Sequence, residues 1–226
     1  MLIRRVQLGC PDLGAQYRFY AEHLTLPCSL QTDRLVVTVG RSELIFTEHP
    51  GPTAIAHVAW NIPANMLPAA AAWLRERTTL LSDSDGESIF ISDAPWNAEA
   101  IYFVDPAGHI LELIARQRLP AAQHPFTPDQ ILAISEVGIA NDDLPAAVAR
   151  ATQQLGITVF SGAGSDTFTA IGDDEGLLIM VKHGRTWFPN TGIPAALIPL
   201  TTEVEQGGRC FRLAGPPYTI EPIACE

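Results

Sequence analysis

The sequence has few basic residues and no long apolar run. Its 226 residues include 14 lysines and arginines against 25 aspartates and glutamates, a formal charge of -11. Because nucleic-acid binding depends on clustered Lys and Arg, this balance disfavours a nucleic-acid partner. No apolar stretch approaches the roughly 18 residues that span a bilayer, so we expect no membrane partner. Small molecules are therefore the expected partners.

The sequence also lacks cysteine pairs at a zinc or redox spacing. Cys10, Cys28, Cys210 and Cys225 are scattered along the chain, which predicts free buried thiols in a reducing compartment. The first residues pass at once into a strand-like pattern, without the three regions of a secretory signal. We therefore expect a cytoplasmic protein. A Gly-rich phosphate loop and a nucleophile elbow are lacking too.

What the sequence does contain is a pattern that occurs three times, a short strand followed by an amphipathic helix. The apolar positions of the helices that begin near Leu13 and Leu144 share the spacing i, i+4, i+7, i+11. Pro or Asp follows each strand within a few residues and suits a helix start. Stretches of β-branched and aromatic residues follow each helix, so the pattern predicts three βαβββ modules. Their first strands are expected at residues 4–9, 56–61 and 135–140.

The modules predict how the chain is divided. We expect residues 1–116 to hold the first two modules, paired with each other in one domain, and residues 131–226 to hold the third module, followed by a truncated set of strands without a helix. Residues 117–130 contain three prolines and no periodic pattern, which is typical of a linker. The predicted fold class is α+β, with tandem βαβββ modules that form cupped mixed sheets.

A motif at the end of the second module carries a family resemblance. The segment Tyr102–Leu113 reads YFVDPAGHILEL, which resembles the aromatic-x-Asp-Pro-x-Gly-x-x-x-Glu-Leu signature of the vicinal oxygen chelate superfamily. Phe19-Tyr20 and the following Leu-Thr-Leu-Pro resemble a second motif of that family, with Thr25 in place of the usual glycine. The motifs cover residues 1 to about 116 and imply a glyoxalase-like fold. His109, at the exit of a predicted type I turn, is expected to face solvent.

The resemblance implies a metal site in the second module. His57 stands at the first-strand ligand position, and Glu112 stands at the final-strand position. The equivalent first-strand residue is Arg5 in the first module and Glu136 in the third. A divalent metal such as Zn, Mn, Fe or Ni is the implied cofactor, but two ligands leave the set incomplete, because a firm site usually has three. The candidates for the third ligand are Gln7, Glu48 and His49.

An alternative is a cup without metal. Strand alternation places Glu112 on the face of Ile110 and Ile114, where an ionised carboxylate is costly without a partner. Arg5 is the predicted partner, since a guanidinium forks onto a carboxylate. Arg5 and Glu112 would then be the catalytic or ligand-binding residues of the cup. Replacing Arg5 by histidine would create a metal site.

Two functions follow from the resemblance. The first is a metal-dependent lyase, isomerase or ring-cleaving dioxygenase, in which a bound ion polarises the vicinal oxygens of a small substrate. The second is a metal-free protein of the bleomycin-resistance kind, which sequesters an organic ligand. Arg5 favours the second, whereas His57 with Glu112 favours the first. Related proteins pair modules between chains, so the resemblance also suggests a homodimer.

Overall fold

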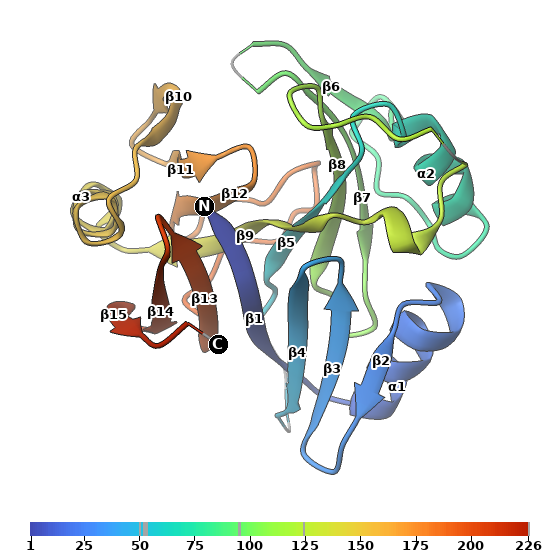
Figure 1. The fold of residues 1–226 in the computed structure, drawn as a ribbon, viewed down its shortest axis with the longest axis horizontal. Helices are drawn as coiled ribbons and strands as arrows, with labels where there is room; N and C mark the ends of the chain where they lie inside the picture. Colours follow the sequence, from blue (N-terminus) through green and yellow to red (C-terminus); the bar gives the residue numbers. More distant parts are fainter. Residues whose placement is uncertain (50, 52–53, 95, 124, 226) are drawn as a thin grey trace.

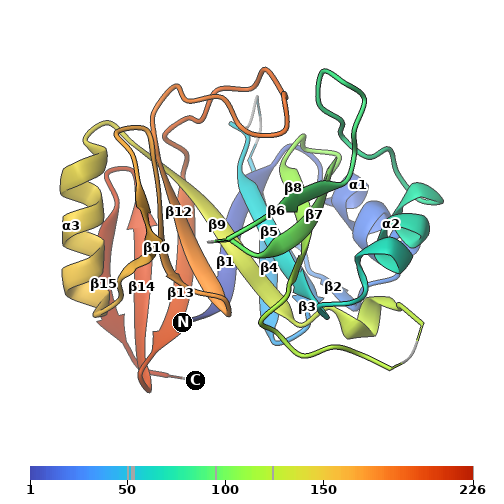
Figure 2. The ribbon, with the colours of Figure 1, turned by 90° about the horizontal axis from the view of Figure 1, so that it is seen from above.

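The computed structural model describes residues 1–226 apart from 50, 52–53, 95, 124 and 226. Residue 124 of the predicted linker and residue 226 of the predicted last segment thus lie outside the described residues. The described chain has the predicted α+β fold, in which fifteen strands join in one mixed sheet (Figure 1). Figure 2 shows α3 at one end of the molecule and both α1 and α2 at the other.

Three segments of the chain run strand, helix, strands. The first has β1 (Leu2–Cys10), α1 (Leu13–Tyr17), the π-helix η1 (Arg18–His23), β2 (Cys28–Leu30), β3 (Arg34–Val39) and β4 (Ser42–Glu48). The second has β5 (His57–Ile62), α2 (Leu67–Arg75), β6 (Phe90–Ser92), β7 (Ala98–Val104) and β8 (Ile110–Arg116), and the short 3-10 helix η2 (Pro128–Gln130) follows it. The third has β9 (Ala133–Asn141), α3 (Leu144–Leu155), β10 (Val159–Gly164), β11 (Phe168–Asp173) and β12 (Gly176–Lys182). The last strands are β13 (Leu200–Gln206), β14 (Arg209–Gly215) and β15 (Thr219–Ile223).

Local sequence signals account for the starts of two helices. The carboxylates of Asp12 and Asp143 each accept a hydrogen bond from the backbone N–H three residues later, at 2.9 and 3.1 Å, and so cap α1 and α3. Thr25, which replaces the usual glycine of the second motif, has φ 54°, a conformation in which a β-branched residue is strained. Among the described residues, no helix is long and apolar enough to cross a bilayer.

The modules pair with different partners from those expected. Within each module the first strand pairs in parallel with the last, as β1 with β4, β5 with β8 and β9 with β12. Between modules, β5 pairs antiparallel with β9, and β1 pairs antiparallel with β13. The second module thus shares its sheet with the third, and the first module with the last three strands. This corrects the expectation that modules one and two share one cup.

We name the two halves of the sheet by this pairing. The first cup is the half made by β5 to β12, and the second cup is the half made by β1 to β4 with β13 to β15. The two halves meet where Ile3 of β1 pairs with Ile134 of β9. Both cups therefore draw on strands from each side of residues 117–130, and the division into two domains at that segment stays a prediction.

Alternation along the central strands separates a packed face from the concave face. On β5, Val58, Trp60 and Ile62 belong to the main hydrophobic core, whereas Ala59 belongs to a separate small cluster with Ala98 and other residues. The same period of two places Glu112 on the concave face of β8, as predicted. The small alanine side chains leave open space on the concave face, whereas the larger side chains fill the core face.

The Asp105 turn of the signature motif ties the first two modules together. The turn has the expected hydrogen bond from Gly108 N–H to the Asp105 carbonyl, at 2.9 Å. The Asp105 carboxylate accepts further hydrogen bonds from Gln16 Nε2 at 2.7 Å and Tyr20 Oη at 3.1 Å, both from the helical segment of module one. Tyr20 is the tyrosine of the second motif, so the two motifs meet in one buried contact.

His109 is buried, and the expectation that it faces solvent is wrong. Its side chain is 1% exposed. The ring Nδ1 accepts the backbone N–H of Ala56 at 3.1 Å, and Nε2 donates to the carbonyl of Gly9 at 3.0 Å. The residue therefore joins the start of β5 to the end of β1, which is a structural role.

A disulfide joins Cys210 of β14 to Cys225 after β15, so the prediction of four free thiols is wrong. The register pairs Cys210 with Ile223, which brings the chain two residues later back within reach. Cys10 and Cys28 remain free, the first buried and the second half-buried. The argument for a reducing compartment that rested on four thiols therefore no longer holds.

We expect Cys225→Ser to lower the free energy of unfolding by about 3 kcal/mol, the chain-entropy value for a loop of this length, since the bridge closes a separation of 15 residues. Cys225 is exposed, so the change removes little packing. Urea titration followed by circular dichroism measures the loss. Wild type in excess reductant should match the variant, and an unchanged midpoint in both would contradict the expectation.

Candidate metal centre

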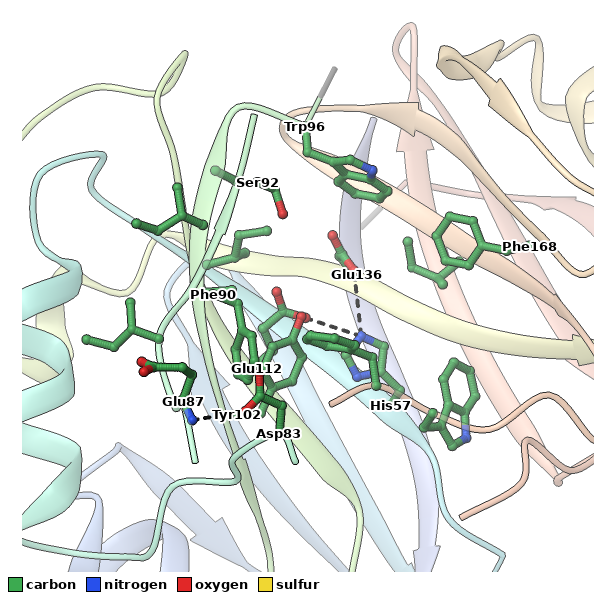
Figure 3. Close-up of a pocket in the computed structure, with 18 of the residues that line it drawn as sticks. His57, Asp83, Glu87, Phe90, Ser92, Trp96, Tyr102, Glu112, Glu136 and Phe168 are labelled. Atoms are coloured by element: carbon green, nitrogen blue, oxygen red, sulfur yellow. Dashed lines mark hydrogen bonds and ion pairs between the residues drawn. The ribbon is translucent and has the colours of Figure 1, made fainter. Parts of the chain in front are cut away.

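Three neighbouring strands bring two carboxylates and an imidazole to the concave face of the first cup. Ala59 on β5 lies opposite Glu112 on β8 and opposite Glu136 on β9. Residues directly opposite each other share a face of a sheet, and His57 shares that face with Ala59 because side chains alternate. The small Ala59 side chain leaves the space in which the longer side chains meet. Figure 3 shows Glu112 and Glu136 both directed at the His57 ring.

The distances within this cluster suit a shared ion. His57 Nε2 lies 3.5 Å from Glu112 Oε2 and 3.6 Å from Glu136 Oε2. One potential ligand atom from each residue lies within 4.8 Å of the others, and the three residues are at most 6% exposed. Ligand atoms that sit about 2 Å from one ion lie roughly 3 to 4 Å apart. The cluster therefore needs little movement to hold one.

Arg116 lies behind the cluster and is fully buried. Its guanidinium forms an ion pair with Glu136 Oε1 and lies 3.4 Å from Ser135 Oγ. The other oxygen of Glu136 is the one directed at His57. Arg116 thus fixes the orientation of Glu136 while one carboxylate oxygen remains available.

Arg5 is not at this site, which corrects the prediction that it reaches Glu112. It lines a separate cavity of about 400 Å³ in the second cup. There Arg5 Nε lies 2.8 Å from Glu43 Oε2, and Arg5 Nη1 lies 3.2 Å from Glu203 Oε2. The prediction failed because it took modules one and two to share a cup. The arginine beside the carboxylates is Arg116, which no repeat position indicated.

The environment shifts the pKa values of the two carboxyl groups in opposite directions. Burial, together with the charge of Glu136, raises the pKa of Glu112 well above its usual value, although Arg116 opposes the shift. Burial would raise the pKa of Glu136 as well, but hydrogen bonds and charges from His57 and Arg116 outweigh it and lower that pKa. Burial raises the pKa of Tyr102, which is hydrogen-bonded to Glu112.

The charge of the cluster fits a divalent ion. With both carboxylates ionised, Arg116 offsets only one of the two negative charges, and an unpaired buried charge is costly. A divalent cation would offset the remainder and find an imidazole and two carboxylates as ligands. Each carboxylate also has an outer partner, Tyr102 for Glu112 and Arg116 for Glu136. Such partners commonly orient metal ligands.

The cluster lines a cavity of about 490 Å³ with aromatic walls. Trp187, on the segment after β12, has its ring centroid 5.5 Å from that of His57. This approach depends on Gly138 of β9, because a Cβ there would lie 2.5 Å from the Trp187 ring. The other aromatic side chains of the wall are Phe90, Trp96, Tyr102, Phe168 and Phe188.

Glu136 is the third residue of the cluster, and it is not among the residues that were predicted as a third ligand. Gln7, Glu48 and His49 do not belong to the cluster in the described structure. The repeat already placed Glu136 at the position of His57 in the third module, so the signal was present. What the sequence did not reveal was that module three, rather than module one, faces module two.

The arrangement of strands and cups is that of the vicinal oxygen chelate fold. No protein-family model and no curated protein sequence matches the chain. Solved structures do match, among them a single-substitution mutant of glyoxalase I from Zea mays, at 13% identity and a TM-score of 0.59, over 94% of this chain and 87% of that one.

Two further structures agree with this fold. Another mutant of the Zea mays glyoxalase I matches at 14% identity and a TM-score of 0.57, over 98% of this chain and 93% of that one. A protein from Bacillus subtilis, provisionally described as a dioxygenase, matches at 14% identity and a TM-score of 0.56, over 86% and 68%. The chain therefore has the glyoxalase-like fold that the motifs predicted, and likeness at this identity carries the fold alone.

Proposed function

We propose that this protein is a metal-dependent enzyme that acts on a small organic molecule in the first cup, with His57, Glu112 and Glu136 as ligands of a divalent ion. The observation that carries the proposal is the set of three buried ligand atoms within 4.8 Å of one another on the wall of a 490 Å³ cavity. Similarity in fold to glyoxalase I and to a provisional dioxygenase favours lyase, isomerase or ring-cleaving chemistry.

An ion at this site would act as a Lewis acid toward an oxygen of the substrate. The protein contributes binding and orientation. Arg116 holds one oxygen of Glu136 and so fixes the direction of that carboxylate. The aromatic side chains around the cluster provide an apolar surface for the body of the substrate and limit the access of water.

The donor set narrows the choice of metal. Carboxylate oxygens suit manganese, and imidazole suits zinc, iron and nickel. The cluster contains no thiolate, so it has no special preference for the soft ions that cysteine selects. Manganese, iron, zinc and nickel are therefore the ions to test.

We expect protein purified without chelator to bind one divalent ion per chain. Elemental analysis gives the resident metal, and calorimetric titration after treatment with EDTA gives the stoichiometry. Glu203→Gln is the matched control and should titrate like wild type, because Glu203 lies in the other cup. Loaded protein is then assayed on catechols and hydroxyketones, whose oxygens are vicinal. A metal content near zero with no heat of binding would contradict the proposal.

A metal-free binding protein is the second candidate, and Arg116 favours it. This buried cation already neutralises Glu136, and burial raises the pKa of Glu112, which favours its neutral form. A cluster in that state needs no ion to remain buried. Ligand binding that is unaffected by EDTA would support this candidate, together with a calorimetric metal titration that shows no heat of binding.

A further inference from the structure

Arg185 lies on the cavity wall with no carboxylate partner among the residues that the structure describes. Its guanidinium carbon lies 5.0 Å from the centroid of the Phe168 ring. Its side-chain hydrogen bond among those residues runs from Nη1 to the carbonyl of Thr186, at 3.3 Å. An arginine carries five donors, so most of its capacity is not used by these neighbours.

The backbone around Arg185 is held in place by its own hydrogen bonds. The Arg185 N–H donates to the carbonyl of Lys182 at 3.0 Å, and the Arg185 carbonyl accepts from Ala195 N–H at 2.8 Å. Thr186 forms an isolated antiparallel bridge with Pro194. The side chain is therefore presented from a fixed hairpin next to Trp187, which packs on His57.

The environment of Arg185 disfavours an unpaired cation. Its side chain is half-buried, and burial lowers the pKa of the guanidinium. The face of Phe168 offers a cation–π contact, but it supplies no hydrogen bonds. An oxyanion from outside the protein would provide both charge and acceptors in the bidentate geometry that a guanidinium prefers.

Four carboxyl groups line the cavity, those of Asp83, Glu87, Glu112 and Glu136, and Arg185 beside Phe168 is the one arginine among the described lining residues. Asp83 and Glu87 line the cavity on the side away from Phe168 (Figure 3). Asp83 Oδ1 accepts backbone N–H groups of Asp85 and Glu87, at 2.9 and 3.0 Å, and so stays fixed there. An anionic group would be repelled on that side and attracted beside Phe168.

We propose that Arg185 binds the carboxylate of a small aromatic acid, whose ring packs against the aromatic side chains of the first cup. This inference rests on the proposed function only in taking this cavity as the substrate site. It adds the class of substrate, an aromatic carboxylate, and it names Arg185 as the residue that selects it. Phe168 lies beside Arg185, and the Trp96 ring lies 6.1 Å from the Phe168 ring.

The test compares two probes of the same shape, 2-naphthoate and the neutral 2-naphthamide. Binding is measured by NMR titration in EDTA, so that no metal can attract the carboxylate. Wild type should prefer naphthoate by about tenfold or more, as expected for one charge-assisted pair. Arg185→Gln should lose this preference while it binds naphthamide within about twofold of wild type, which also shows that the variant is folded.

Arg209→Gln is the matched control. Arg209 lies 4.9 Å from the Phe211 ring in the same kind of contact, but on β14, away from this cavity. It should bind both probes like wild type. Equal binding of the two probes by wild type, or equal weakening of both by Arg185→Gln, would overturn the inference. Because no metal is present, these outcomes are independent of the metal titration that tests the proposed function.

Discussion

Glu136→Gln should lower the affinity for a divalent ion by at least about 100-fold. Loss of a residue that only hydrogen-bonds to a metal ligand already lowers metal affinity about 10- to 100-fold. Glutamine keeps the size of the side chain but removes the charge. The remaining His57 and Glu112 form the marginal two-ligand site that the second module offers by itself. Calorimetric titration of the EDTA-treated variant with Mn²⁺ and Zn²⁺ measures the loss.

Glu203→Gln is the matched control for this experiment. Glu203 is also a glutamate, on β13, which pairs with β1 as β9 pairs with β5. It accepts hydrogen bonds from Arg212 at 2.8 and 3.1 Å. It lines the second cup, so its loss should leave metal affinity unchanged. Equal affinity in wild type and Glu136→Gln would place the ion elsewhere, or would show that Glu136 serves only as the partner of Arg116.

The local signals in this sequence were sufficient for the modules. Asp12 and Asp143 begin helices because their carboxylates cap backbone amides three residues later. The Asp105–Gly108 turn forms because its residue types fit a type I turn. These are interactions over a few positions, so the sequence pattern is enough to predict them. The fold class followed from their repetition.

The long-range pairing was not visible in the same way. β5 and β9 are separated by more than 70 positions, and nothing in their sequences says that they lie side by side. Each first strand has the same apolar pattern, so β9 and β1 were equally suitable neighbours for β5. The choice between them decided the site, because it brought Glu136 rather than Arg5 to His57. The sequence of the second module was therefore enough to name His57 and Glu112 as candidate ligands, whereas their meeting with Glu136 became visible only in the structure.

Arg116→Met should lower the free energy of unfolding by about 3–5 kcal/mol in EDTA, the usual cost of removing one partner of a buried ion pair. Methionine fills much of the same volume, so the loss is mainly electrostatic. In this variant Glu136 would remain buried without a cation to pair with, and Glu112 would lie next to it. Urea unfolding followed by tryptophan fluorescence gives the value. Added Mn²⁺ should raise the stability of this variant more than that of wild type, because the ion then replaces the missing positive charge.

Arg118→Met provides the comparison, two residues further along the chain. Arg118 pairs with Asp174 at 2.6 Å, and its guanidinium, like that of Arg116, lies over the Phe160 ring. Arg118 is exposed, so removing its pair should cost about 1 kcal/mol or less. Adding Glu136→Gln to Arg116→Met should recover part of the larger loss, since it removes the charge that was left unpaired. A loss near 1 kcal/mol for Arg116→Met, with no recovery in the double variant, would mean that Glu136 is already neutral or solvated, and that the cluster lacks the uncompensated charge that favours a metal.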